Sequence, residues 1–226
     1  MHTAIRTLSI PGVIAAAALA LVPALPAHAL GLGIEFGSGV NKTETRNVGS
    51  FSRIEASGAT ELEITAGQTA TVVTVSGDDN MVPLVKTTVS GNVLIIKTDN
   101  VENTKLPLVV KIGMPKLAAI EAFGASKISA VNLTGQRFEL VGSGSTKATI
   151  GGTVDNLVIK LSGAGRVDAG GLAAREAEIR SSGASTVEVN ASDKLSVHIS
   201  GAGKVTYLGH PAITQHISGA GNIAAK

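Results

Sequence analysis

The chain has 226 residues, with 19 lysines and arginines against 17 aspartates and glutamates and a formal net charge of only +2. This balance excludes the strong basic excess that marks a nucleic-acid-binding surface, so we expect no nucleic-acid partner. Aromatic residues make up 2% of the chain and tryptophan is absent, which excludes a groove of stacked aromatic rings. The absence of cysteine excludes disulfides and a lipid-modified cysteine anchor.

Residues 1–29 have the three parts of a secretory signal peptide. His2 and Arg6 give a short basic start, residues 10–25 are apolar, and Pro26-Ala27-His28-Ala29 supplies the small residues that a signal peptidase requires. The apolar stretch is shorter than the roughly 20 residues of a membrane-spanning helix. We therefore expect cleavage after Ala29, no transmembrane segment afterwards, and an exported protein in the periplasm, on the outer surface or secreted.

Residues 30–47 are predicted to be a flexible leader, followed by a single all-β domain over residues 48–226. The first part of this domain, residues 48–116, is irregular and β-rich. Ser90-Gly91-Asn92 is typical of a hairpin turn, so this part has room for antiparallel pairing. Its strand-like segments are residues 61–65, 71–76, 82–89, 93–98 and 106–112.

A short glycine motif recurs through the rest of the chain, usually as Ser-Gly-Ala followed by Gly or Ser. Successive aligned glycines are separated by 20, 19, 20, 18 and 18 residues, at Gly124, Gly144, Gly163, Gly183, Gly201 and Gly219. An earlier copy of the motif contains Gly58. Apolar and polar residues alternate before each glycine, which predicts strands rather than helices.

This period predicts a single-stranded parallel β-helix, or β-solenoid, with coils of 18–20 residues. Residues 117–226 would form the regular coils, each made of two or three short strands joined by tight turns. One glycine per coil would form the same corner, where glycine permits a positive φ and close backbone approach. A meander with a hairpin at each motif is the alternative. The predicted corner glycines are Gly144, Gly163, Gly183, Gly201 and Gly219.

Three further segments and the recurrent motif together resemble the bacterial head GIN domain family. The segments are Phe51-Ser52-Arg53-Ile54, residues 75–80 (Val-Ser-Gly-Asp-Asp-Asn) and residues 91–96 (Gly-Asn-Val-Leu-Ile-Ile). This family of unknown function is described as auto-transporter adhesins, and the resemblance covers about residues 48–223. It implies an exported β-helical domain with an adhesin-like role, and it supplies no catalytic residues.

The sequence holds no pattern of a catalytic centre. The serines before the glycines repeat in one column, whereas a catalytic serine is unique and flanked by a base. Asp78-Asp79-Asn80 is typical of a turn rather than of paired catalytic carboxylates. We therefore predict no enzymatic activity and no cofactor, with a polysaccharide-active enzyme as the weakest alternative.

His198 and His216 occupy the same position in consecutive repeats and would lie close together in a parallel stack. Two imidazoles can share a cation, but a metal site needs three or four ligands. Lys160 and Arg180 occupy the same position upstream, which indicates a solvated polar face. We predict no metal site.

The position three residues after each aligned glycine is mostly basic, with Lys127, Lys147, Arg166 and Lys204 interrupted by Thr186. A charged face that maintains solubility would explain this pattern. The functional interpretation is a binding column for an anionic polysaccharide or another envelope component. We call these four basic residues the basic column.

The sequence thus favours a non-catalytic envelope or cell-surface binding module, adhesin-like in character. The alternative is a structural, self-assembling β-solenoid scaffold. In that case the chain would form a homo-oligomer through an uncapped last coil near Ala225 and Lys226, because open strand edges pair readily.

Overall fold

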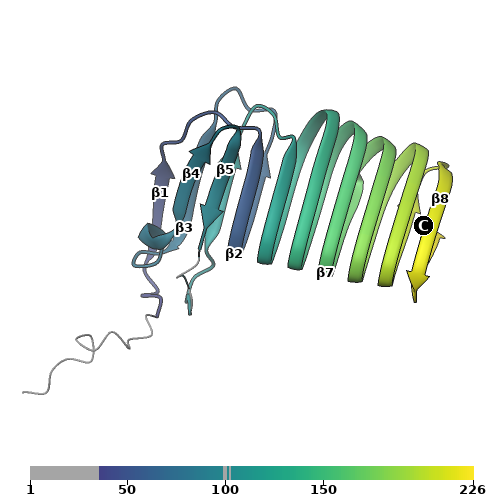
Figure 1. Ribbon diagram of the computed structural model, residues 1–226. Helices are drawn as coiled ribbons and strands as arrows, with labels where there is room; N and C mark the ends of the chain where they lie inside the picture. Colours follow the sequence, from purple (N-terminus) through teal and green to yellow (C-terminus); the bar gives the residue numbers. More distant parts are fainter. Residues whose placement is uncertain (1–35, 99–100, 102) are drawn as a thin grey trace, which may run out of the picture. The chain divides into compact units, whose positions relative to one another are not determined.

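The computed structural model describes residues 36–98, 101 and 103–226 (Figure 1). The predicted signal peptide and the first residues of the predicted leader lie outside these described residues. Across the described part of the chain, no helix combines the length and apolarity needed to cross a membrane.

The described strands belong to one nine-stranded sheet, and one short 3-10 helix accompanies them. Their bounds are β1 (Asn41–Arg46), β2 (Arg53–Thr65), β3 (Val72–Asp78), η2 (Val82–Leu84), β4 (Lys86–Ser90), β5 (Val93–Lys97), β6 (Val109–Gly113), β7 (Ala119–Leu208), β8 (Ala212–Gly219) and β9 (Asn222–Ala225).

The sheet mixes two pairing directions. β1 pairs with β3, β3 with β6, and β4 with β5 in antiparallel fashion. β2 runs parallel to β5, β6 and β7, and β7 runs parallel to β8 and β9. The hairpin expected at Ser90-Gly91-Asn92 is confirmed, because Ser90 pairs with Val93 across the β4–β5 turn.

The predicted fold class, a parallel β-solenoid of separate coils, was wrong. The chain is all-β, but its strands form one mixed sheet that curls nearly closed, like a barrel. The antiparallel pairs in the first half, for which the sequence left room, make the sheet a mixed one, because short strands there reverse direction through turns. The expected short strands with tight turns are also not found in the second half, where β7 runs unbroken for 90 residues.

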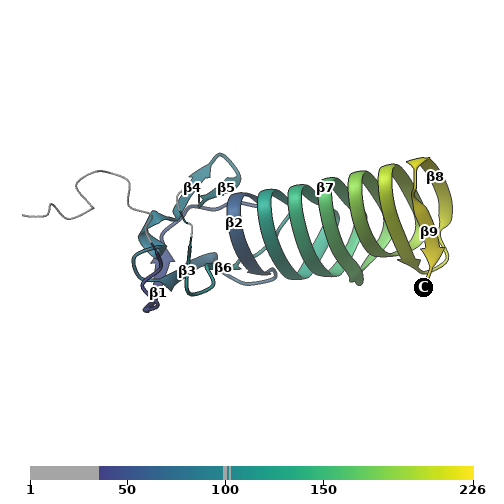
Figure 2. The same ribbon diagram turned by 90° about the horizontal axis from the view of Figure 1, so that it is seen from below.

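β7 bends without losing its extended character. Figures 1 and 2 show it winding so that its successive stretches lie side by side. We call the stretch from one aligned glycine to the next a pass. Bending occurs at the glycines, whose φ angles lie between +97° at Gly124 and +120° at Gly183 and Gly201. Because a positive φ is open to glycine but costly for other residues, the backbone turns there and the strand continues.

Each aligned glycine lies against the glycine of the preceding pass. A Cβ added to Gly144 would lie 2.6 Å from the carbonyl oxygen of Gly124, and one added to Gly163 would lie 2.6 Å from that of Gly144. The same close contact recurs at Gly183, Gly201 and Gly219, and Gly124 lies in this way against Gly58 of β2. We call these seven residues the glycine ladder. It fixes the register of every pass.

Aliphatic side chains fill the interior of the curled sheet. Buried and exposed residues alternate along β7, so that Leu195, Val197 and Ile199 point inward while His198 and Ser200 are exposed. This is the period of two expected for a strand with one face on the core. Phe138 is the largest of the fully buried side chains, and most of the others are Val, Ile, Leu and Ala.

The N-terminal part is more ordered than the sequence indicated. Residues 41–46 of the predicted flexible leader form β1, paired along its length with β3. Asp78, at the end of β3, connects this strand to two loops through side-chain hydrogen bonds. Its buried carboxylate accepts hydrogen bonds from the backbone N–H groups of Gly39 at 2.7 Å, Lys105 at 2.9 Å and Leu106 at 3.0 Å.

Candidate functional site

The glycine ladder places the basic column on one exposed face. The side chains of Lys127, Lys147, Arg166 and Lys204 are all exposed, three residues after their glycines. The strand pairing fixes the register at both ends of the column. Lys127 lies opposite Glu61 of β2, and Lys204 lies opposite Asn222 of β9. The stacked glycines set the same register for the passes between them. Residues that are 18–20 positions apart in sequence therefore become neighbours.

Glu61 is the first member of this column and was not predicted from the sequence. It stands three residues after Gly58, so the earlier copy of the motif could have revealed it. Its carboxylate forms an ion pair with Lys127. Within the described residues, no carboxylate lies within ion-pair distance of Lys147, Arg166 or Lys204. The unneutralised charge of the column thus resides on these three residues.

The surroundings of the basic column are small on one side and polar on the other. The exposed position between glycine and base holds only alanine or serine, as at Ser145 and Ala164, so the basic side chains are accessible. Asp168 lies two residues beyond Arg166, and Glu188, which lies two residues beyond Thr186, pairs with Lys226 at 2.7 Å. Asp168 therefore weakens the local positive potential near Arg166.

The face is hollowed at the start of the basic column. A depression of about 380 Å³ lies at Glu61, Lys127 and Lys147, with Thr104 and Ser145 also on its walls. Oxygen acceptors and ammonium donors line this hollow together, an arrangement suited to a polar ligand with an anionic group.

A longer groove lies on the other side of the glycine ladder. It has a volume of about 500 Å³ and is bordered by the serines that precede the glycines. Beside them stand the residues three positions before each glycine. We call it the serine groove. Its serines are Ser143, Ser162, Ser182, Ser200 and Ser218, and its second row is Val141, Lys160, Arg180, His198 and His216.

From the sequence, this second row was predicted to be a solvated polar face. His198 and His216 are neighbours in register, as expected, with ring centroids 6.2 Å apart. Among the described residues, no cluster of three or more His, Cys, Asp or Glu side chains could hold a metal ion. The groove itself could not be predicted from the sequence, because its depth comes from the backbone bend at the glycines.

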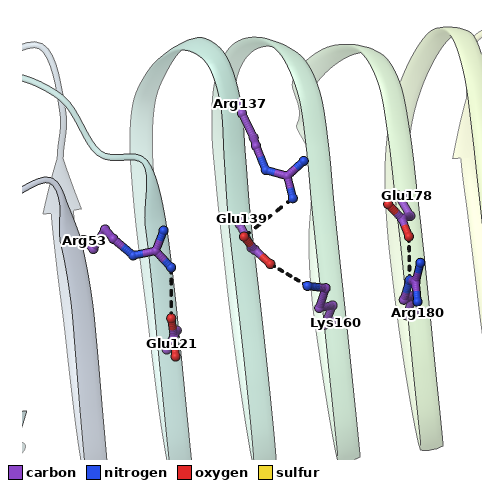
Figure 3. Close-up of polar contacts among 7 residues, drawn as sticks. All are labelled: Arg53, Glu121, Arg137, Glu139, Lys160, Glu178 and Arg180. Atoms are coloured by element: carbon purple, nitrogen blue, oxygen red, sulfur yellow. Dashed lines mark hydrogen bonds and ion pairs between the residues drawn. The ribbon is translucent and has the colours of Figure 1, made fainter. Parts of the chain in front are cut away.

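Ion pairs line the strands beside the serine groove (Figure 3). Glu139 bridges Arg137 at 3.6 Å and Lys160 at 2.8 Å, and the hydrogen bond from Lys160 lowers the pKa of the Glu139 carboxyl. In the pass after that of Lys160, Glu178 forms an ion pair with Arg180. The cationic ends of Lys160 and Arg180 therefore each contact a glutamate of their own surface, and Lys160 shares its glutamate with Arg137.

Asp78 has a structural role. Burial raises the pKa of its carboxyl, but the three backbone N–H groups and the nearby Lys105 outweigh this effect and lower the pKa below the ordinary value. A carboxylate so fully occupied by backbone donors is poorly placed to act as a general base.

The family model described as "Putative auto-transporter adhesin, head GIN domain" matches residues 50–211. The chain belongs to this family. The resemblance found in the sequence is thereby confirmed. The description of the head GIN domain indicates an exported or cell-surface protein of adhesin-like character.

Solved structures share this head GIN fold, whereas no curated protein matches the chain. A "putative adhesin" from Bacteroides fragilis is 24% identical with a TM-score of 0.69, covering 85% of this chain and 100% of its own. One from Parabacteroides distasonis is 21% identical with a TM-score of 0.52, covering 84% and 98%. A "putative lipid binding protein" from Parabacteroides distasonis is 22% identical with a TM-score of 0.54, covering 85% and 99%. At these identities the likeness shows the fold alone.

Proposed function

We propose that this head GIN domain is a non-catalytic binding module of the cell envelope or surface, and that its basic column holds a linear anionic polymer such as an acidic polysaccharide. The observation that carries the proposal is the register of β7. It aligns Lys147, Arg166 and Lys204 on one exposed face without ion-pair partners among the described residues.

The geometry of the column suits an extended ligand better than a compact one. Neighbouring passes of a sheet are about 4.8 Å apart, so the four steps from Lys127 to Lys204 span about 19 Å. Exposed ion pairs contribute little individually, and several must act together to give useful affinity. Thr186 leaves one step of the column uncharged. We therefore expect weak, multivalent binding that added salt reduces.

Location in the envelope is part of this proposal. The signal-like residues 1–29 support export with cleavage after Ala29. The adhesin-like description of the family supports a place where the protein meets extracellular or envelope polymers.

A binding assay with a matched control tests the proposal. The probe is dextran sulfate, a linear anionic polysaccharide, at low ionic strength, with neutral dextran for comparison. Changing Lys127, Lys147, Arg166 and Lys204 together to Gln should abolish retention of the protein on dextran sulfate while circular dichroism stays unchanged. The control replaces four exposed lysines of the N-terminal part, Lys42, Lys86, Lys97 and Lys116.

Because both variants lose four positive charges, a difference between them reports position rather than net charge. Equal retention of the two variants would overturn the proposal, as would failure of the parent protein to bind dextran sulfate at low salt.

A self-associating scaffold is the second candidate function, favoured by the edge at β8. Within the described residues β8 pairs only with β7. Ile213 is 40% exposed there, whereas its partner in register, Leu195, is fully buried. An open, partly apolar edge can pair with another chain. Light scattering over a concentration series decides this question: a rising mass supports assembly, and a constant monomer mass excludes it.

A further inference from the structure

The serine groove has one apolar end. Val141 borders the groove at its first pass. One pass earlier, Phe123 stands in the same column as the groove serines and is 39% exposed. The apolar surface of Phe123 therefore stands one pass beyond the residues that line that end of the groove.

The middle of the groove is less charged than its residue types indicate. The ammonium of Lys160 is held by Glu139 and the guanidinium of Arg180 by Glu178, as Figure 3 shows. With their charged ends tied to these glutamates, the two side chains offer mainly their aliphatic stems to the groove. Leu161 also lines it. This part of the groove suits a hydrocarbon chain better than a row of charges.

The other end of the groove carries the two imidazoles. His198 and His216 are both exposed, with ring centroids 6.2 Å apart, and both line the groove. An imidazole ring carries an N–H that can donate a hydrogen bond to an anionic oxygen. Two neighbouring imidazoles can therefore bind one anionic group between them.

Charged groups on the neighbouring passes also face His198. An adjoining hollow of about 380 Å³ contains His198 together with cationic and anionic side chains. Glu178 in this hollow is occupied by Arg180. The remaining charged residues of the hollow are Arg137, Glu176 and Lys194, and Arg137 shares Glu139 with Lys160. Glu176 and Lys194 balance each other, so the shared glutamate leaves one net positive charge near His198, which favours an anionic group there.

We propose that the serine groove binds a single-chain anionic amphiphile of the fatty-acid class. Its hydrocarbon chain lies across the passes from the Phe123 and Val141 end, and its anionic head lies at His198 and His216. The four steps from Val141 to His216 span about 19 Å, the length of an extended long acyl chain. The groove volume of about 500 Å³ falls within the range of small-molecule sites. A polyanion fits less well, because glutamates already engage the cationic ends of Lys160 and Arg180 in the middle of the groove.

This site lies on the other side of the glycine ladder from the basic column and does not depend on it. The test therefore uses a different probe, a C16 alkyl sulfonate with a fluorophore at the chain end, kept below its micelle concentration. A sulfonate is fully anionic at neutral pH. We expect saturable binding that is about threefold to tenfold tighter than the binding of the uncharged C16 alcohol, because two imidazole N–H groups meet the anionic head.

Two variants locate the site. Ser182→Phe places a ring in the middle of the groove, and should weaken binding of the sulfonate at least about tenfold by blocking a shape-matched site. The fold should accept it, because Phe123 occupies the same column one pass before Ser143. The matched control is Ala184→Phe, an exposed residue on the opposite side of Gly183 from Ser182. The double change His198→Ala and His216→Ala should lower the affinity for the sulfonate to that for the uncharged C16 alcohol, because the anionic head loses both imidazole N–H donors.

Three experimental results would overturn the proposal. Equal binding of the uncharged C16 alcohol would remove the role of the imidazoles. Equal loss of affinity in Ser182→Phe and Ala184→Phe would show that the groove is not the site. Displacement of the sulfonate by dextran sulfate, together with no binding of a C16 fatty acid, would assign the groove to a polymer instead. Unchanged circular dichroism in every variant excludes unfolding as the cause.

Discussion

At the scale of single residues, two side chains face each other inside each bend of β7, and a large one is paired with a small one. The residue two before each glycine faces the residue two after it. A Cβ added to Gly203 would lie 2.9 Å from Ile199, and one added to Gly165 would lie 3.0 Å from Leu161. Where the first residue is small, the second is larger: a Cβ on Gly142 would lie 2.7 Å from the hydroxyl of Thr146. This compensation explains why the motif ends in Gly in some passes and in Ser or Thr in others.

A double-mutant cycle measures this compensation. Gly203→Ser should destabilise the protein by about 1–3 kcal/mol, because the hydroxymethyl group overpacks the corner against Ile199. Ile199→Ala should cost about 2–5 kcal/mol by leaving a cavity. The double variant recreates the Ala122 and Ser126 combination found in an earlier pass, so its loss should be smaller than the sum by about 1 kcal/mol or more. Urea unfolding provides the values, and simple additivity would contradict the packing argument.

The glycine ladder itself is tested by adding a branched side chain. Gly201 has φ +120°, and its added Cβ would lie 2.6 Å from the carbonyl oxygen of Gly183. Gly201→Val should therefore destabilise the protein by about 2–5 kcal/mol through strain and overpacking. Gly49 has no atom within 4 Å of an added Cβ, so Gly49→Val is the control. Matching thermal midpoints of the two variants would rule out a sterically required ladder.

The corner glycines could be predicted from the sequence, but their partners across the bend could not. A glycine that recurs at constant phase signals a backbone requirement, whatever the chain topology. The volume exchange between positions such as Ile199 and Gly203 becomes meaningful only when the direction of each side chain inside the bend is known.

At the scale of elements, the sequence predicted strands better than it predicted their pairing. The segments at residues 71–76, 93–98 and 106–112 overlap β3, β5 and β6. Alternation of apolar and polar residues reveals which face of a strand is buried, but not which strand lies beside it. β6 shows the difficulty, because it runs parallel to β2 and antiparallel to β3. The mixed sheet was missed for this reason.

Asp78 predicts a specific response to acid. The pKa of its carboxyl is lowered in the folded protein from an ordinary value of 3.8. A lowered pKa means that the folded state favours the charged form, so the stabilisation is complete above pH 3.8. It is lost as the pH falls toward the folded pKa. Thermal unfolding midpoints of the wild type should therefore drop through this window.

The matched variant for this prediction is Asp78→Asn, which retains the shape but not the charge. It should lower the midpoint at pH 7, because three backbone N–H groups lose a charged acceptor. The midpoints of the two proteins should converge as the pH falls below 3.8. A difference that stays constant from pH 7 to pH 2.5 would show that the charge of Asp78 contributes nothing.

At the scale of the whole molecule, export predicts a defined N-terminus. The pattern of residues 1–29 places signal-peptidase cleavage after Ala29, so the exported protein should begin at Leu30. Intact-mass spectrometry of protein recovered from the periplasm or the medium checks this. Exported protein that retains Met1 would refute the prediction.

The basic column could be predicted from the sequence because it needs only a constant period and a constant phase. Its acidic first member, Glu61, was missed because β2 is separated from β7 by β3, β4, β5 and β6 in the chain. The serine groove is a property of the bent surface, to which backbone, serine and aliphatic stems all contribute. A depression of this kind cannot be predicted from the spacing of residue types in the sequence.

The central claim is that the register of β7 brings distant residues into continuous rows, on which both proposed sites depend. The natural chain has no cysteine, so pairs of introduced cysteines can report this directly. Lys147→Cys with Arg166→Cys places two thiols in adjacent passes of the basic column, where strands about 4.8 Å apart bring them within reach of a disulfide. The control pair is Lys147→Cys with Arg175→Cys, exposed but out of register. We predict rapid intramolecular crosslinking of the first pair under mild oxidation and little of the second. Equal crosslinking of both pairs would contradict the account.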